Sequence, residues 1–167
     1  LLVVLMQLIG ADLRLGNRMA NRLRGSAQQR RTLELIRNEL AISSGWSVEL
    51  TRSHQWPCGM AGRQPVLAIG LDSSNTLALP QNIVYSVGVA PSPIWRGQVL
   101  MRCGPAYGLD GAMKSGGKAQ NRVVIDGLPK DGLGFQARQE PRSKVLHLQL
   151  EQESFAGSSR LRSAAVF

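Results

Sequence analysis

The first forty or so residues have the hydrophobic pattern of a helix. A nearly unbroken apolar run, Leu1 to Ile9, is followed by a polar segment without proline that reaches Leu40. In that segment apolar residues recur every four positions, which places them in a narrow stripe on one side of a helix. They are Leu15, Met19, Leu23 and Ala27.

The helical pattern broadens before it stops. Leu33, Leu35, Ile36 and Leu40 form a wider apolar face, so we expect Arg31 to Ile42 to pack on the rest of the protein. Ser43-Ser44-Gly45 ends the pattern with residues common after a helix. We predict one long helix over residues 1–43, with bends at Gly10, Gly16 and Gly25 because glycine weakens a helix.

From Trp46 onward the pattern changes to alternating apolar and polar positions separated by turn residues, which is typical of strands. We predict strands over Trp46–Thr51, Val66–Leu71, Ile83–Val89, Gln98–Cys103, Arg122–Asp126, Gly134–Arg138, Val145–Glu151 and Leu161–Phe167. A run of strands after one long helix indicates an α+β fold with an antiparallel sheet. The chain then divides into an N-terminal helix, residues 1–43, and a β-rich head domain, residues 44–167.

Composition adds a strong positive charge to this picture. The net charge is +9, and seven arginines lie in the helical segment: Arg14, Arg18, Arg22, Arg24, Arg30, Arg31 and Arg37. They could form a solvated helix face beside a membrane or an acidic neighbouring subunit. They could also bind anionic lipid head groups or DNA through phosphate contacts.

Two cysteines, Cys58 and Cys103, are too few for a disulfide scaffold. In an exported protein such a pair usually forms one bridge. The bridge would close a loop of roughly 45 residues and contribute about 3–4 kcal/mol. In a cytosolic protein both would remain free thiols.

The sequence provides no residue set for catalysis or for a cofactor. His147 alternates with leucines in a strand and should face outward, while His54 has no nucleophile motif nearby. The stretch from Gly111 to Ala119 lacks the spacing of a phosphate loop. Asp110, Asp126 and Asp131 are too dispersed for calcium, so we expect them in turns. We therefore expect no enzyme, no metal and no cofactor.

Three stretches of the chain, in this order and spacing, resemble the type IV pilin and pseudopilin superfamily. They are Gln28 to Leu40, then Asn82 to Val87 with Gly97 to Arg102, and finally Val123 to Leu128 with Leu133 to Ala137. The likeness is greatest to the J-type pseudopilins of type II secretion and to the W-type minor pilins. Leu1-Leu2-Val3-Val4-Leu5 is similar to the later part of a mature pilin tip.

The resemblance implies a structural subunit that assembles through its N-terminal helix into a type IV pilus or a type II secretion pseudopilus. Its apolar tip would enter the inner membrane and later pack between helices of other pilin subunits. The residues concerned are Leu1, Leu2, Val3, Val4, Leu5, Met6, Leu8 and Ile9.

This run is shorter than the roughly 20 apolar residues that cross a bilayer, so we expect it to be the later part of a longer apolar segment. The resemblance further implies prepilin-type N-terminal methylation, a head domain in the periplasm and, after assembly, a place in the pilus or at the cell surface. Export would also favour the bridge between Cys58 and Cys103. DNA or anionic-surface binding by the arginines is the alternative function, and no small-molecule substrate is expected.

Overall fold

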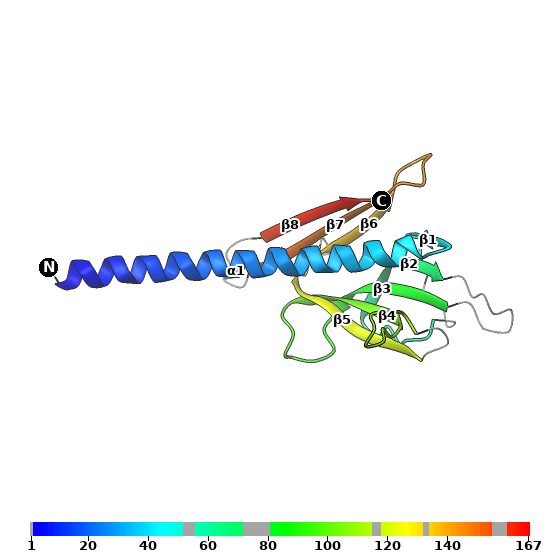
Figure 1. Cartoon of the computed structure of the whole chain (residues 1–167), viewed down its shortest axis with the longest axis horizontal. Coiled ribbons are helices and arrows are strands. Elements are labelled where there is room, and N and C mark those ends of the chain that lie inside the picture. The colour runs from blue at the N-terminus through cyan, green and yellow to red at the C-terminus, as the bar shows by residue number, and fades with distance from the viewer. Residues whose placement is uncertain (1, 52–55, 72–80, 115–117, 132–133, 155–159) are drawn as a thin grey trace.

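The computed structural model describes the chain except for residues 1, 52–55, 72–80, 115–117, 132–133 and 155–159, and it describes side chains of the helix from residue 14 onward. One helix, α1 (Leu2–Ala41), runs the length of the molecule, with strands on two sides of its C-terminal half (Figure 1). Its end is fixed by Ser43, whose Oγ and backbone N–H donate to the Leu40 carbonyl at 2.8 and 3.2 Å.

The helix is continuous from Leu2 to Ala41 and shows no bend at the three glycines where the sequence predicts one (Figure 1). Gly25 is buried, and a Cβ atom there would lie 2.5 Å from Cδ1 of Leu161. The glycine therefore lets the last strand approach the helix closely. A Cβ atom at Gly16 would meet nothing within 4 Å.

The strands form two antiparallel sheets, so the predicted α+β fold is confirmed. The larger sheet has the order β1-β2-β3-β4-β5, and these strands follow one another along the chain. They are β1 (Gly45–Ser47), β2 (Arg63–Leu71), β3 (Gln81–Val89), β4 (Gln98–Pro105) and β5 (Ala119–Leu128). The smaller sheet has the order β6-β7-β8, formed by β6 (Phe135–Gln139), β7 (Leu146–Glu153) and β8 (Arg160–Val166).

All eight predicted strands are present, with boundaries that differ by a few residues. The largest difference is β1, which ends at Ser47 rather than Thr51. Packing of the helix also begins earlier than the predicted Arg31, because Gly25 and Gln29 are already buried. At the other end of that segment Ile42 remains 59% exposed, since it lies beyond the last helical turn.

A single core joins the helix to both sheets. Leu33 and Ile36 of α1 pack with Tyr85 and Leu100 of the larger sheet and with the leucines of β7. Those leucines are Leu146, Leu148 and Leu150. Burial of these side chains stabilises the fold by about 1.5–3 kcal/mol for each large residue.

Glutamines complete the junction where the helix meets the two sheets. Gln29 donates to the Leu161 carbonyl at 3.0 Å. Gln152 of β7 donates to Gln28 at 3.1 Å and to the Asp126 carbonyl of β5 at 3.0 Å. Because these polar groups are buried or partly buried, the hydrogen bonds are needed to offset their loss of contact with water.

The predicted disulfide between Cys58 and Cys103 is confirmed, and it joins residues 45 apart in the sequence. Cys103 lies on β4 next to Arg102, so its side chain points to the sheet face opposite the helix. The bonded segment is fastened a second time, because the Gly59 carbonyl accepts hydrogen bonds from Arg63 at 2.8 Å and from Asn121 at 3.2 Å.

Replacing both cysteines, Cys58→Ala with Cys103→Ala, should lower the free energy of unfolding by about 3–4 kcal/mol, since the open loop gains conformational freedom in the unfolded chain. Urea unfolding of the oxidised wild type, the reduced wild type and the variant measures the effect. Reduced wild type is the matched control because it keeps both sulfur atoms. Mass analysis without reductant should find no free thiol, and two free thiols in exported protein would contradict the bridge.

Candidate functional site

The N-terminal half of α1 extends past the sheets (Figure 1). An apolar stripe on this half is exposed. Residues 2–24 span about 35 Å at the rise of an α-helix. On this part Leu15, Met19 and Leu23 are 58%, 60% and 70% exposed. Three large apolar side chains on one side of a helix, outside any core, form a surface suited to packing against another helix.

Arginines accompany the stripe. Arg14, Arg18 and Arg22 each precede a stripe residue by one position, so they form a parallel row of exposed cations on the adjacent side of the helix. Arg24 and Arg31 fall on a different side, and Arg30 lies further along toward β8. Residues 13–33 contain no acidic residue, so nothing within this segment offsets the charge.

The other half of the helix is held by a buried carboxylate. Glu39 has no exposed surface. It accepts three hydrogen bonds, two from the larger sheet and one from the loop between β4 and β5. Tyr85 Oη and Arg102 Nε each lie 2.5 Å from its oxygens, and Tyr107 Oη lies 2.8 Å away. Arg102 also donates to the Pro105 carbonyl at 2.9 Å. We call Glu39, Tyr85, Arg102 and Tyr107 the anchor cluster.

Burial of the anchor cluster strengthens the electrostatic attraction between its charged groups. The side chains of Arg102 and Glu39 are only 5% and 0% exposed, so their attraction is little screened by water. The Arg102 guanidinium carbon lies 5.1 Å from the centre of the Tyr107 ring, which adds a cation–π contact. Burial raises the pKa of Tyr85 well above its ordinary value, and the Glu39 carboxylate raises it further. Burial and the hydrogen bond to Glu39 also raise the pKa of Tyr107.

Sequence reasoning missed the anchor cluster, although one signal was present. Glu39 lies three residues after Ile36 and one before Leu40, so it interrupts the apolar face of the helix. Arg102 is likewise the one charged residue of the predicted strand Gln98–Cys103. An acid and a base on two facing apolar surfaces indicate a buried pair, because an isolated buried charge is too costly.

Most residues of the predicted apolar tip lie in the first turns of α1, where the structure describes only the backbone. They are Leu2, Val3, Val4, Leu5, Met6, Leu8 and Ile9. Leu1 and His54 lie outside the described residues. His147 is exposed on β7, as predicted.

The aspartates have local structural roles. Asp110 forms a turn by accepting from the Ala112 backbone at 3.1 Å. Asp131 pairs with Arg160 at 2.8 Å. Asp126 lies in β5 rather than in a turn, and it accepts from the Arg96 backbone at 3.0 Å. In the part of the chain that is described, no three His, Cys, Asp or Glu residues gather where they could hold a metal ion.

The architecture, a long N-terminal helix packed on antiparallel sheets, is pilin-like. Within the described residues, no helix combines the length and the apolar character needed to cross a membrane. No protein-family model, curated protein or solved structure matches the chain.

The anchor cluster predicts strong coupling between its two charges. Arg102→Met should lower the free energy of unfolding by about 3–5 kcal/mol, because Glu39 stays buried without its cation. Adding Glu39→Gln to this variant should recover part of the loss, so the double variant costs less than the sum of the single ones. Urea unfolding of the four proteins provides the measurement.

The matched control for this cycle is Arg160→Met. It breaks an ion pair with Asp131 whose side chains are 46% and 44% exposed. It also removes a 3.4 Å contact with Glu151, which keeps Arg162 as a cation at 3.2 Å, so the cost should be about 0–1 kcal/mol. Equal costs for Arg102→Met and Arg160→Met, or strictly additive costs in the cycle, would contradict the proposed anchoring.

The two tyrosines of the chain, Tyr85 and Tyr107, both belong to the anchor cluster, so alkaline titration reports on it directly. Their pKa is raised in the folded state, whereas an unfolded tyrosine titrates near about pH 10. Stability should be fully present below about pH 10 and fall as pH rises above it, because only the unfolded chain then loses phenol protons.

Near-ultraviolet phenolate absorbance should accordingly rise only when the protein unfolds. Tyr107→Phe is the informative variant, since it leaves the buried Tyr85 as the sole chromophore of this kind. Reversible phenolate formation near pH 10 in protein that is still folded would show that the tyrosines are not held as described.

Proposed function

We propose that this chain is a structural subunit of the pilin or pseudopilin type, which assembles with other such subunits through the exposed half of α1. The observation that carries this proposal is the uncovered stripe of Leu15, Met19 and Leu23 on a helix whose other half is fixed to the head domain. Association is then the activity, and the subunit performs no chemistry.

In this mechanism the head domain is presented outward while the helices of neighbouring subunits bury one another's stripes. The apolar N-terminal tip would hold the subunit in the inner membrane before assembly, with the head in the periplasm. Each Leu or Met side chain that becomes buried contributes about 1.5–3 kcal/mol to association. Type IV pili and type II secretion pseudopili are the assemblies that the resemblance of the chain suggests.

The assembly proposal predicts that the stripe is required. A triple variant, Leu15→Gln with Met19→Gln and Leu23→Gln, should reduce recovery of the subunit in sheared filaments by more than about tenfold, since about 1.4 kcal/mol already gives that factor. A photo-crosslinking residue at position 19 should capture other pilin subunits in the native host, whereas one at His147 should not.

The matched control changes the other side of the same segment, Asn17→Gln with Asn21→Gln, and should assemble normally. Urea unfolding of both variants verifies that the head domain is intact. Normal assembly of the triple variant would overturn the proposal.

A second candidate function is binding of DNA or another anionic surface, and the row of Arg14, Arg18 and Arg22 favours it. The three side chains are exposed and regularly spaced, without an acid among residues 13–33. Such a row can contact successive phosphates, and its affinity would fall steeply with salt. This function is compatible with assembly, because the arginines and the stripe occupy adjacent sides of the helix.

If the arginine row binds duplex DNA, replacing all three arginines by glutamine should reduce the slope of log affinity against log salt by about 2.7, at about 0.9 per phosphate contact. The control removes the same charge from loops of the head domain by Lys114→Gln, Lys118→Gln and Lys130→Gln. Fluorescence anisotropy with a labelled duplex measures both. Absence of binding at low salt, or an equal change in the control, would reject this function.

A further inference from the structure

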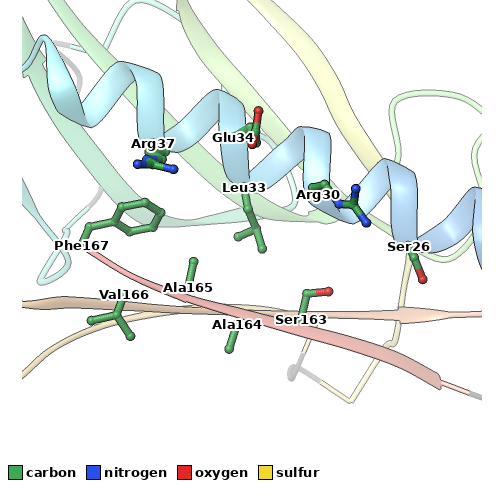
Figure 2. Close-up of a pocket in the computed structure, with 10 residues that line it drawn as sticks. All are labelled: Ser26, Arg30, Leu33, Glu34, Arg37, Ser163, Ala164, Ala165, Val166 and Phe167. Carbon is green, nitrogen blue, oxygen red and sulfur yellow. The ribbon is translucent and has the colours of Figure 1, made fainter.

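A groove of about 800 Å³ lies between α1 and the last strand, away from the anchor cluster (Figure 2). The helix contributes Ser26, Arg30, Leu33, Glu34 and Arg37 to its lining. Strand β8 and the residue after it contribute five consecutive residues, Ser163 to Phe167. In Figure 2 Ala165 and Phe167 point toward the helix, while Ala164 and Val166 point away from it.

The five consecutive residues show that the groove follows the edge of the strand. Side chains alternate between the two faces of a sheet, so neither face alone could contribute all five. Strand β8 pairs with β7 and is the last strand in the order of its sheet. Its other edge is therefore open to the groove.

The hydrogen bonds of the ladder identify which backbone groups face that edge. Phe167 and Leu146 exchange both backbone hydrogen bonds, at 2.8 and 2.9 Å. Because such pairs alternate along an antiparallel ladder without a register shift, Ala165 and Ser163 also bond to β7. The N–H and C=O groups of Ala164 and Val166 point the other way, where the described part of the chain offers them no backbone partner.

The two halves of this edge differ in their protection. Exposed strand edges are commonly guarded by charged side chains. At one end Arg160 and Arg162 guard the edge and pair with the buried Glu151 at 3.4 and 3.2 Å. The half that lines the groove has instead the small Ala164 and the 60% exposed Val166. The half of the edge without charged side chains, Ser163 to Val166, is therefore the one that faces the groove beside α1.

The charge of the groove selects an acidic occupant. Arg30 and Arg37 are exposed along its helix side, where Glu34 is the single acid among the lining residues of the described chain. A second groove, of about 470 Å³, shares Arg37 and Phe167 with the first and adds Lys144. A second copy of this chain, with net charge +9, would be repelled from such a surface.

We propose that the β8 edge from Ser163 to Val166 binds an extended acidic segment of a partner protein, which adds to β6-β7-β8 as a fourth strand. Backbone groups of Ala164 and Val166 would supply the hydrogen bonds of strand addition. Arg30 and Arg37 would pair with carboxylates on the side of the segment that faces the helix. This site is separate from the stripe at Leu15, Met19 and Leu23, so it does not depend on the assembly proposal.

The test uses the full oxidised chain and a short labelled peptide in which valine and glutamate alternate, with a lysine-for-glutamate peptide for comparison. The glutamate peptide should bind saturably and protect the Ala164 and Val166 amides from hydrogen exchange. The lysine peptide should bind at least about tenfold more weakly, a difference of about 1.4 kcal/mol. Equal binding of both peptides, or binding of neither, would overturn the proposal.

Ala164→Pro should abolish binding, because proline removes the outward N–H while costing no bond to β7. Ala164→Thr keeps that N–H and should bind normally. Arg30→Glu with Arg37→Glu should reverse the preference toward the lysine peptide, which keeps the test decisive even if the proline variant unfolds. Binding that survives in folded Ala164→Pro protein, or a dimer that forms through this edge, would refute strand addition by an acidic partner.

Discussion

Burial of the Glu39 carboxylate is the constraint on which the arrangement of this molecule depends. A carboxylate without water contact costs several kcal/mol unless its partners are correctly placed. Rotating α1 by one residue would turn the carboxylate about 100° away from Tyr85, Arg102 and Tyr107. Sliding the helix by one turn would move it about 5.4 Å from the same partners. The anchor cluster therefore specifies both the rotation and the axial position of the helix on the larger sheet.

Fixing the helix at one end also sets the direction of its other end. Because α1 is continuous from Leu2 to Ala41, the rotation set at Glu39 decides which way Leu15, Met19 and Leu23 face relative to the head domain. Ser26, Arg30, Leu33 and Arg37 follow these residues at spacings of three and four, so they continue the same side of the helix toward β8. The exposed stripe and the groove are therefore two separate sites on the same side of α1.

Much of this fold could be predicted from the sequence because the signals were local. The four-residue spacing of Leu15, Met19 and Leu23 predicts a helix, and the alternation from Leu146 to Leu150 predicts a strand. Features that depend on contacts between distant segments could not be predicted in this way. Glycine propensity alone predicts that Gly25 weakens the helix. In the structure it is the place where Leu161, far along the chain, approaches the helix. The anchor cluster was missed for the same reason, since Glu39 and Arg102 are 63 residues apart.

Strand β4 carries two fastenings on consecutive residues that point to opposite faces of the sheet. Arg102 joins it to the helix, and Cys103 joins it covalently to the segment around Cys58. Tension applied along α1 would enter the head domain at Glu39, through Arg102 into β4, and at Gln28 and Gln29, through their hydrogen bonds to β7 and β8. Hydrogen bonds to β3 and β5 would then spread the load sideways, and the disulfide would carry it to the far face. Under such a force, β4 would pass load both to its neighbouring strands and to the disulfide-bonded segment.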